Sequence, residues 1–308
     1  MVRYFLTMSY IGTRYRGMQK HGIGENVNQV DFIQGAIEAA LSRLVPASIN
    51  PPFLTVSSRT DAGVHALHSS AHVELQNKYD VMYDSSSLIR WANRYFTRCG
   101  HDIRITSCVP VTHEFHARHC AKSRTYIYRF LVDKLPGSNS FPISELDRSF
   151  HIGSSDFDVE KLQKALDVFK GRKDFQTFTP NKKSRKPIRY VRTLNYFKLE
   201  KSAPLILDGP FVDNFHYYHL KVNGKSFLYN QVRRMVGALF AVARGRITEK
   251  DLRTMVQVPN YKNWNPRATA VPACGLYLAD VEYDPEELKR CTIVPENCAV
   301  VDLDNEIE

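Results

Sequence analysis

The spacing of apolar side chains predicts strands and helices along the first half of the chain. Near the N-terminus every second residue is apolar, namely Val2, Tyr4, Leu6, Met8 and Tyr10. This is the period-two pattern of a half-buried strand. Apolar steps of three and four predict helices at about 30–44 and 85–98, and apolar runs at 53–56, 71–75, 103–105 and 125–132 predict further strands.

The second half partly repeats this order of elements. The pattern predicts a helix at 158–170, strands near 188–199 and 215–222, a long helix at 226–244 and a closing strand at 275–283. The pair Asn223-Gly224 is typical of a short turn between strands. Gly245 is placed to end the long helix, and Thr248 with Asp251 to cap the next one.

This order of elements predicts an α+β fold. We expect two similar α+β halves with mostly antiparallel sheets and flanking helices, and an active-site cleft between them. The predicted domains are residues 1–135 and 157–285, joined by a Pro-, Gly- and Ser-rich linker at 136–156 and followed by an acidic tail at 286–308.

Charge and composition narrow the class of partner. The chain of 308 residues has a formal charge of +10, and its last eight residues hold four acids and no base, so the remainder carries +14. Such a body attracts nucleic acid, although an anionic membrane or simple solubility also fits. No apolar run approaches the ~18 residues that a membrane span needs. The six cysteines form no C-x-x-C pair and suit a reducing compartment.

The run SSRTDAGVHAL, 57–67, places charged and small residues in the connection between two apolar stretches. Asp61 is a candidate nucleophile, because a carboxylate can attack without a base to activate it. Arg59 would keep it charged in a dry cleft, and Gly63 can take a positive φ there. The alternative is an Asx-turn or cap carboxylate with no chemical role.

Bases and aromatic residues interleave in FHARHCAKSRTYIYRF, 115–130. Arg118, Arg124 and Tyr126 would let this segment hold phosphates and stack a base. The alternative is a solvated basic strand edge with its tyrosines in the core. Histidines recur three apart at 113, 116 and 119, but we predict no metal site, because the flanking pattern indicates extended chain and no carboxylate or cysteine completes a ligand set.

Two further basic segments are candidates. Arg233 interrupts the apolar pattern of SFLYNQVRRMVGALF, 226–240, and could point toward a carboxylate; the alternative is a surface position. The loop NKKSRKPIRYVR, 181–192, is either a soluble basic loop or a site of phosphate contact. Its candidate residues for phosphate contact are Lys182, Lys183, Arg185 and Lys186.

Together these segments resemble the TruA-type tRNA pseudouridine synthase family. RTDAGVHA at 59–66 matches the catalytic motif of that family, and FHAR with SRTYIYR, SFLYNQVRRMVG and CGLYL at 274–278 resemble its later motifs in order. YIGTRYRGMQ at 10–19 is similar to its first segment. Ser58 and Met18 depart from the usual glycine and tryptophan, and put the tRNA positions in doubt. The motifs look most like the animal pseudouridine synthase-like branch.

The resemblance implies isomerisation of uridine to pseudouridine in tRNA, on the 3′ side of the anticodon stem-loop, without metal or cofactor. It implies that Asp61 is the nucleophile, at the ribose C1′ or through a glycal, and that Arg59 helps extrude or replace the target nucleotide. Tyr126 would stack on the uracil, Arg233 would pair with Asp61, and Leu276 would pack near the base. Bacterial relatives are homodimers, so a homodimer is possible.

Two rival functions and two compartments stay open at this point. The chain could be a non-catalytic tRNA-binding protein or RNA chaperone, or a metal-dependent nuclease that uses Asp61 and His65. No Arg-rich presequence precedes the first strand, which favours the cytoplasm. The resemblance to the animal branch instead favours mitochondria.

Overall fold

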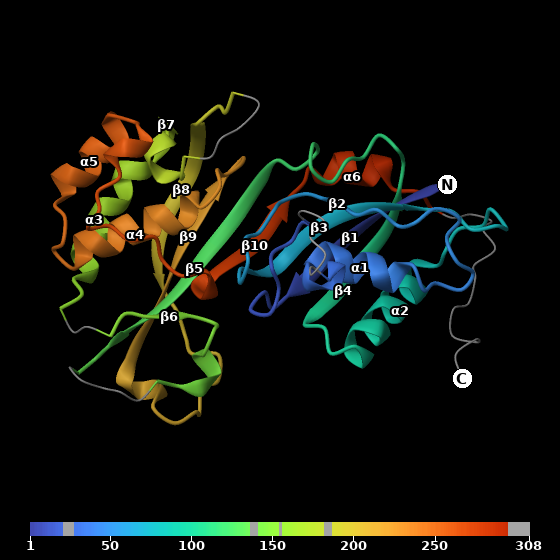
Figure 1. Cartoon of the computed structure of the whole chain (residues 1–308), viewed down its shortest axis with the longest axis horizontal. Helices are drawn as coiled ribbons and strands as arrows, with labels where there is room; N and C mark the ends of the chain where they lie inside the picture. The colour runs from blue at the N-terminus through green and yellow to red at the C-terminus, as the bar shows by residue number, and fades with distance from the viewer. Residues whose placement is uncertain (21–27, 136–140, 154–155, 182–186, 295–308) are drawn as a thin grey trace. The chain divides into compact units, whose positions relative to one another are not determined.

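The computed structural model describes residues 1–20, 28–135, 141–153, 156–181 and 187–294. Its contacts divide the chain into two units: the first contains Met1–Lys122 and Leu278–Glu308, and the second contains Ser123–Tyr277. Both combine helices with mostly antiparallel strands (Figure 1), which confirms the predicted α+β class. The limits of these units differ from those of the predicted domains, 1–135 and 157–285. The domain limits stay a prediction.

The first unit is built on a three-stranded antiparallel core. The strand β1 (Val2–Tyr10) pairs with β3 (His65–Leu75) on one side and with β4 (Ile103–Val111) on the other. The short β2 (Thr55–Val56) pairs with β3, and β10 (Leu276–Glu282) follows β3 in the strand order, with its residues from Leu278 onward in this unit.

Helices cover this core. The helices are α1 (Ile33–Leu41), preceded by the 3-10 turn η1 (Gln29–Asp31), and α2 (Ser85–Arg98), and Figure 1 shows α1 and α2 next to each other. Asp84 caps α2, since its carboxylate accepts the Ser87 N–H at 2.8 Å. Alternation along β1 buries Tyr4 and Met8 completely, as the period-two pattern predicts.

The helix α6 (Pro285–Cys291) was not predicted, because residues from 286 onward were expected to form an acidic tail. Asp284 caps its first turn and Pro285 opens it, as is common at helix starts. Cys291 and Leu288 pack against Phe5 and Phe115. Four acidic and basic side chains in seven residues hide this short apolar stripe from a periodicity analysis. Residues 295–308 lie outside the described residues.

The second unit orders its strands β5-β9-β8-β7, all antiparallel. These are β5 (Ser123–Asp133), β9 (Phe215–Gly224), β8 (Val191–Lys201) and β7 (Gly171–Asp174), and β6 (Phe150–His151) pairs in parallel with β5. The helices are α3 (Val159–Ala165), α4 (Gln231–Ala243) and α5 (Glu249–Gln257). The 3-10 turns are Ile143–Glu145, Leu166–Phe169, Gln176–Phe178, Val212–Asn214, Tyr261–Asn263 and Ala273–Gly275.

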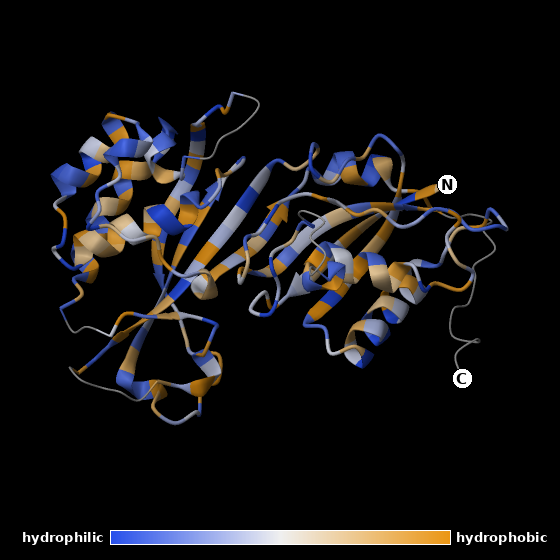
Figure 2. Ribbon diagram, viewed as in Figure 1, coloured by the Kyte–Doolittle hydropathy of each residue, from blue (hydrophilic) through white to orange (hydrophobic). Residues whose placement is uncertain are grey.

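The helix α4 is the buried centre of this unit. Eleven of its 13 residues are buried, and Figure 2 shows it mostly in hydrophobic colours. The two exceptions are Arg233 and Arg234, which are half-buried. Gly245 ends the helix with a φ of 65°, and Thr248 with Asp251 forms the capping box of α5, so both predictions are confirmed.

The Asn223-Gly224 turn prediction is wrong. Both residues lie inside β9, where Gly224 pairs with Arg124 on one side and with Leu194 on the other. A Cβ on Gly224 would lie 2.7 Å from the Thr193 carbonyl oxygen, so the glycine allows a close backbone approach. The buried Asn223 amide donates to the hydroxyls of Ser123 and Thr125 at 2.9 Å each. Tertiary partners therefore override the local turn signal.

Among the described residues, no helix combines the length and the hydropathy that crossing a membrane requires.

Candidate active site

The loop between β2 and β3 carries Asp61 and Arg59. Asp61 is half-buried and Arg59 is exposed. The Val64 N–H donates to the Asp61 carbonyl at 3.1 Å, which closes a tight turn, and Gly63 within it has a φ of 77°. The predicted positive φ of Gly63 is thereby confirmed. This turn presents the Asp61 side chain from a defined backbone rather than from a loose loop.

The segment 10–18 is hydrogen-bonded to this loop at Thr60 and at Gly63. The hydroxyls of Tyr10 and Thr60 are 2.8 Å apart, the Met18 N–H donates to the Thr60 carbonyl at 3.0 Å, and the Gly63 N–H donates to the Tyr15 carbonyl at 3.3 Å. Thr60 is buried. Because these bonds fix the backbone on both sides of Asp61, they position its carboxylate.

Two glycines allow the segment to approach the loop this closely. A Cβ on Gly12 would lie 1.9 Å from the Val64 carbonyl oxygen, and a Cβ on Gly17 would lie 2.9 Å from the Thr60 carbonyl oxygen. Gly17 also has a φ of 116°, which L side chains rarely adopt. The resemblance at 10–19 therefore has a structural basis, because this segment is the support of the Asp61 loop.

His65 is completely buried, and its Nδ1 accepts the Gly12 N–H at 3.0 Å. An imidazole in this position joins the loop to its supporting segment. The nuclease hypothesis assigned His65 to metal or acid–base work, for which a buried ring with an occupied Nδ1 is poorly placed. The roles of Tyr10, Thr60 and Gly12 were missed, although Tyr10 stands out as the last inward residue of β1.

Tyr126 lies in β5 of the second unit, opposite Val222 of β9. It is 6% exposed, and its ring packs edge-on against Phe227 with centroids 5.1 Å apart. Tyr128 on the same strand is completely buried and donates its hydroxyl to the Pro272 carbonyl at 3.0 Å. Burial raises the pKa of Tyr128 well above its ordinary value. Both tyrosines are therefore buried, and of the two only Tyr126 keeps a small exposed surface.

The basic residues of β5 are not a solvated strand edge. Arg124 is 8% exposed and donates to the Lys225 carbonyl at 2.8 Å. Arg129 forms an ion pair at 3.2 Å with Glu145, a carboxylate without exposed surface. Its charge is therefore neutralised within the unit. Arg124, the other β5 arginine, stays a candidate for RNA contact.

Arg233 and Arg234 are neighbours on α4 with different environments. The Arg233 guanidinium donates to the Val271 carbonyl at 2.8 Å and to the Asn230 amide oxygen at 3.1 Å. Arg234 lies 4.6 Å from the ring centroid of Trp264 and donates to the Thr177 carbonyl at 3.1 Å. Arg233 is thus held with an orientation set by α4 and by the segment before β10.

Leu276 begins β10 directly after Gly275 and is 5% exposed. A Cβ on Gly275 would lie 2.6 Å from the Arg129 carbonyl oxygen and 2.8 Å from the Tyr128 ring. This glycine lets the CGLYL segment pass close to β5 in the second unit. The packing of Leu276 near a bound base stays a prediction.

The candidate residues divide between the two units. Asp61, Arg59 and the exposed Arg118 belong to the first, and Tyr126, Arg124, Arg233 and Leu276 belong to the second. The pairing of Asp61 with Arg233 stays a prediction. Lys182, Lys183, Arg185 and Lys186 lie outside the described residues. Within the described ranges, no three histidine, cysteine or acidic side chains are grouped closely enough to hold a metal ion.

Comparisons with known proteins show which family this chain resembles. Residues 165–284 match the family model described as tRNA pseudouridine synthase. The chain is 33% identical to tRNA pseudouridine synthase A of Bacillus sp. (strain KSM-64), over 92% of this chain and 100% of that protein. It is 31% identical to tRNA pseudouridine synthase-like 1 of Xenopus laevis, over 93% of each chain. For the Homo sapiens protein of that name the identity is 30%, over 94% of this chain and 93% of that protein.

The bacterial and animal relatives are thus about equally similar to this chain. The chain belongs to the tRNA pseudouridine synthase family of the TruA type and is therefore an isomerase.

Proposed function

We propose that this protein isomerises uridine to pseudouridine in tRNA, on the 3′ side of the anticodon stem-loop, with Asp61 as the nucleophile. The observation that carries the proposal is the Asp61 turn, which hydrogen bonds from residues 10–18 hold in place. A reacting group needs this fixed backbone, because a displacement of about 1 Å can cost roughly 100-fold in rate. The names of the relatives supply the substrate class.

The reaction exchanges one glycosidic bond for another. The bond between uracil N1 and ribose C1′ breaks, the uracil turns, C5 bonds to C1′, and the C5 proton leaves while N1 gains one. Asp61 would attack C1′ or assist elimination to a glycal; both routes begin with a carboxylate next to the ribose. Atoms and electrons balance within the nucleotide, so no oxidant or reductant takes part.

The remaining candidates serve the movement of the base. Extruding a stacked nucleotide costs a few kcal/mol. The exposed Arg59 would occupy the vacated position, and Tyr126, with Phe227 fixing its ring edge-on, would stack on the detached uracil. Arg233 would pair with the Asp61 carboxylate, and Leu276 would close the apolar side of the base. The basic residues Arg118, Arg124, Lys182, Lys183, Arg185 and Lys186 would offset the extrusion cost through phosphate contacts.

Tritium release from tRNA that contains 5-tritiated uridine tests this function. The wild-type chain should release tritium with the tRNA left at full length, in the presence of chelator. Asp61→Asn should release none while binding tRNA with an affinity within about threefold of wild type, because its charge acts in the reaction and not on a phosphate. A parallel loss of binding would contradict that assignment.

The rival functions predict other results. A tRNA chaperone would bind without tritium release from any tRNA. A metal-dependent nuclease would shorten the RNA and stop in chelator. A homodimer, which the family resemblance implies, is proposed for the active form and is tested by light scattering of the free chain.

A further inference from the structure

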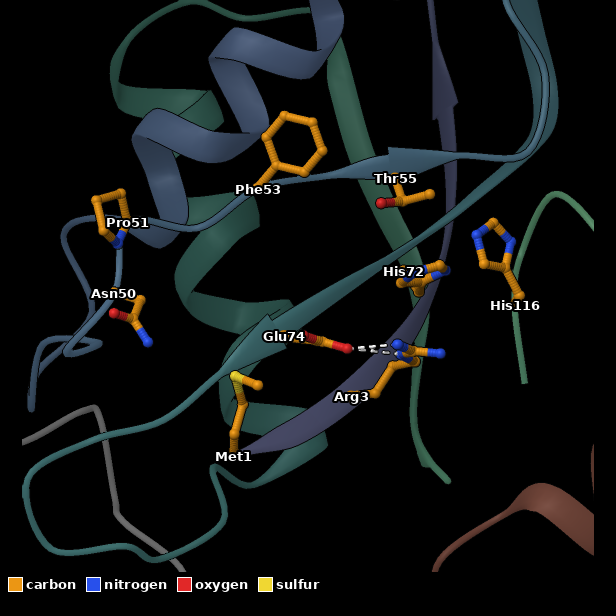
Figure 3. A pocket seen from close by; sticks show the side chains of 9 residues that line it. All are labelled: Met1, Arg3, Asn50, Pro51, Phe53, Thr55, His72, Glu74 and His116. Carbon is orange, nitrogen blue, oxygen red and sulfur yellow. Dashed lines mark hydrogen bonds and ion pairs between the residues drawn. The ribbon is translucent and has the colours of Figure 1, made fainter. Parts of the chain in front are cut away.

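A pocket of about 460 Å³ lies in the first unit, and residues of β2 and β3 line it (Figure 3). Arg3, His72 and Glu74 line it from β1 and β3, while Phe53, Thr55 and His116 line its sides. His72 is seven residues beyond His65 on β3. At roughly 3.3 Å per strand residue, the pocket is about 23 Å along the strand from the loop that carries Asp61.

The charges in this pocket cancel. The Arg3 guanidinium pairs with the Glu74 carboxylate and also donates to the carbonyls of His113 and Phe115, at 2.7 and 2.8 Å. The hydrogen bond from Arg3 lowers the pKa of Glu74, so the carboxylate stays ionised. The Arg3 guanidinium is occupied by the Glu74 carboxylate and by two backbone carbonyls. The pocket therefore has no net positive charge that would attract a phosphate group.

The second carboxylate oxygen of Glu74, Oε2, can still accept a hydrogen bond. The Arg3 hydrogen bonds and the 3.3 Å contact from His113 all go to Oε1 of Glu74, and no described group donates to Oε2. With 32% of the Glu74 side chain exposed, a ligand in the pocket can reach Oε2. The pocket therefore presents an anionic acceptor for one or two N–H groups.

His72 supplies a donor two residues away. Its Nδ1 accepts the Ala117 N–H at 3.1 Å, and burial, with Arg3 and His116 nearby, lowers its pKa to about 4. The ring is therefore neutral at pH 7 and carries its hydrogen on Nε2, where no described residue accepts it. Because residues 72 and 74 share one face of the strand, a donor and a carboxylate acceptor stand side by side.

Phe53 gives the pocket an aromatic face. It precedes β2 in an extended segment, and 65% of its surface is exposed. Figure 3 shows Phe53 and His116 on opposite sides of the group formed by Arg3, His72 and Glu74. The pairing of Thr55 with His72 places β2, and so Phe53 before it, next to the polar groups. An exposed ring beside a donor and an acceptor is the arrangement by which proteins read unpaired bases.

We propose that this pocket binds an unpaired guanine of the tRNA, remote from the reacting uridine. The Watson–Crick edge of guanine presents two adjacent N–H groups, on N1 and N2, beside the O6 acceptor. The Glu74 carboxylate accepts the two N–H groups, the His72 Nε2–H donates to O6, and the base stacks on Phe53. Adenine, cytosine and uracil each lack two adjacent donors on this edge, so they bind less tightly.

This assignment rests on the proposed function in one respect, namely that the guanine belongs to tRNA. Binding of free nucleotides therefore tests the pocket separately from the proposed function. Saturation-transfer NMR of the full chain with GMP, AMP, CMP and UMP should show GMP binding at least about fivefold more tightly than the others. Phe53→Ala should weaken GMP binding at least about fivefold, through loss of base stacking. The matched control is Tyr79→Ala, an aromatic residue 62% exposed in the same unit and outside the pocket, which should bind GMP as wild type does.

Equal binding of the four nucleotides, or a Phe53→Ala variant that binds GMP as wild type does, overturns the proposal. With tRNA as substrate, Phe53→Ala should raise the KM at least about fivefold, and Tyr79→Ala should not. An active wild-type chain with an unchanged KM in Phe53→Ala removes the pocket and keeps the proposed function. An inactive wild-type chain whose GMP binding depends on Phe53 removes the proposed function and keeps the pocket.

Discussion

The close approach of Gly12 to the Asp61 loop predicts a large loss of activity from a single methyl group. In Gly12→Ala the new Cβ would lie 1.9 Å from the Val64 carbonyl oxygen, whereas real contacts are essentially never under 3.0 Å. The loop or its supporting segment must therefore move by at least 1.1 Å, the difference between these two distances. The position of the new Cβ is fixed by the backbone and its partner is a backbone oxygen, so no rotation of a side chain can relieve the clash.

A displacement of about 1 Å at a reacting group costs roughly 100-fold in rate. We expect the kcat for pseudouridine formation to fall by about that factor in Gly12→Ala, with the affinity for tRNA within about threefold of wild type. Overpacking should also cost about 1–3 kcal/mol of unfolding free energy. Single-turnover tritium release, tRNA binding and thermal unfolding measure the three quantities on the same preparation.

The matched control is Gly209→Ala, where the nearest atom to the new Cβ is a Val212 methyl carbon at 3.4 Å. This variant should retain wild-type turnover and stability. Tyr10→Phe is a milder perturbation of the same support, since it removes the 2.8 Å hydroxyl contact with Thr60 and adds no atoms; we expect a loss of about fivefold in kcat, from a hydrogen bond worth about 1 kcal/mol. A folded Gly12→Ala chain with wild-type kcat would refute the view that this segment positions Asp61.

Three further predictions concern charge. Glu145→Gln should destabilise the protein by about 3 kcal/mol in urea unfolding, because it breaks a buried pair with Arg129; an unchanged midpoint would show that the pair contributes nothing. The pKa of His72 is lowered from 6.5 to about 4, so between these pH values the unfolded chain binds a proton that the folded chain does not. The free energy of unfolding should therefore fall as the pH drops from 6.5 toward 4. The expected loss is about 1–2 kcal/mol after allowance for partial solvent screening. His72→Gln should flatten that part of the pH profile, and a profile identical to wild type would contradict this. Replacing Lys182 and Lys183 with alanine should weaken tRNA binding and reduce its salt slope by about 0.7 to 0.9 per lost phosphate contact, and a slope that does not change would exclude the two lysines from the RNA path.

Local patterns in the sequence predict the elements whose causes are local. The alternation of β1, the positive φ of Gly63 and the capping box at Thr248 depend on neighbours within a few residues, and all three are present. The motif around Asp61 likewise locates the candidate loop. What holds that loop depends on Gly12 and Gly17, about fifty residues earlier in the chain.

Elements whose causes are tertiary could not be predicted in this way. The residues next to Arg129 in the sequence do not distinguish it from Arg124. Its ion-pair partner Glu145 is distant in the chain and lies next to it only in the folded structure. Asn223 and Gly224 look like a turn until two neighbouring strands satisfy them. The guanine pocket combines residues 3, 53, 72 and 116, which are distant in the chain. Its aromatic face and its donor–acceptor pair are therefore visible only in the structure.

The central claim is that the Asp61 carboxylate reacts at the ribose of an extruded uridine, and a crystal structure of the chain with tRNA bearing 5-fluorouridine at the target tests it most directly. The account predicts the target nucleotide out of its stack, with a carboxylate oxygen of Asp61 bonded to C1′ or within about 3.5 Å of it. A carboxylate in bulk water, with the target base still stacked or held by other residues, would contradict it.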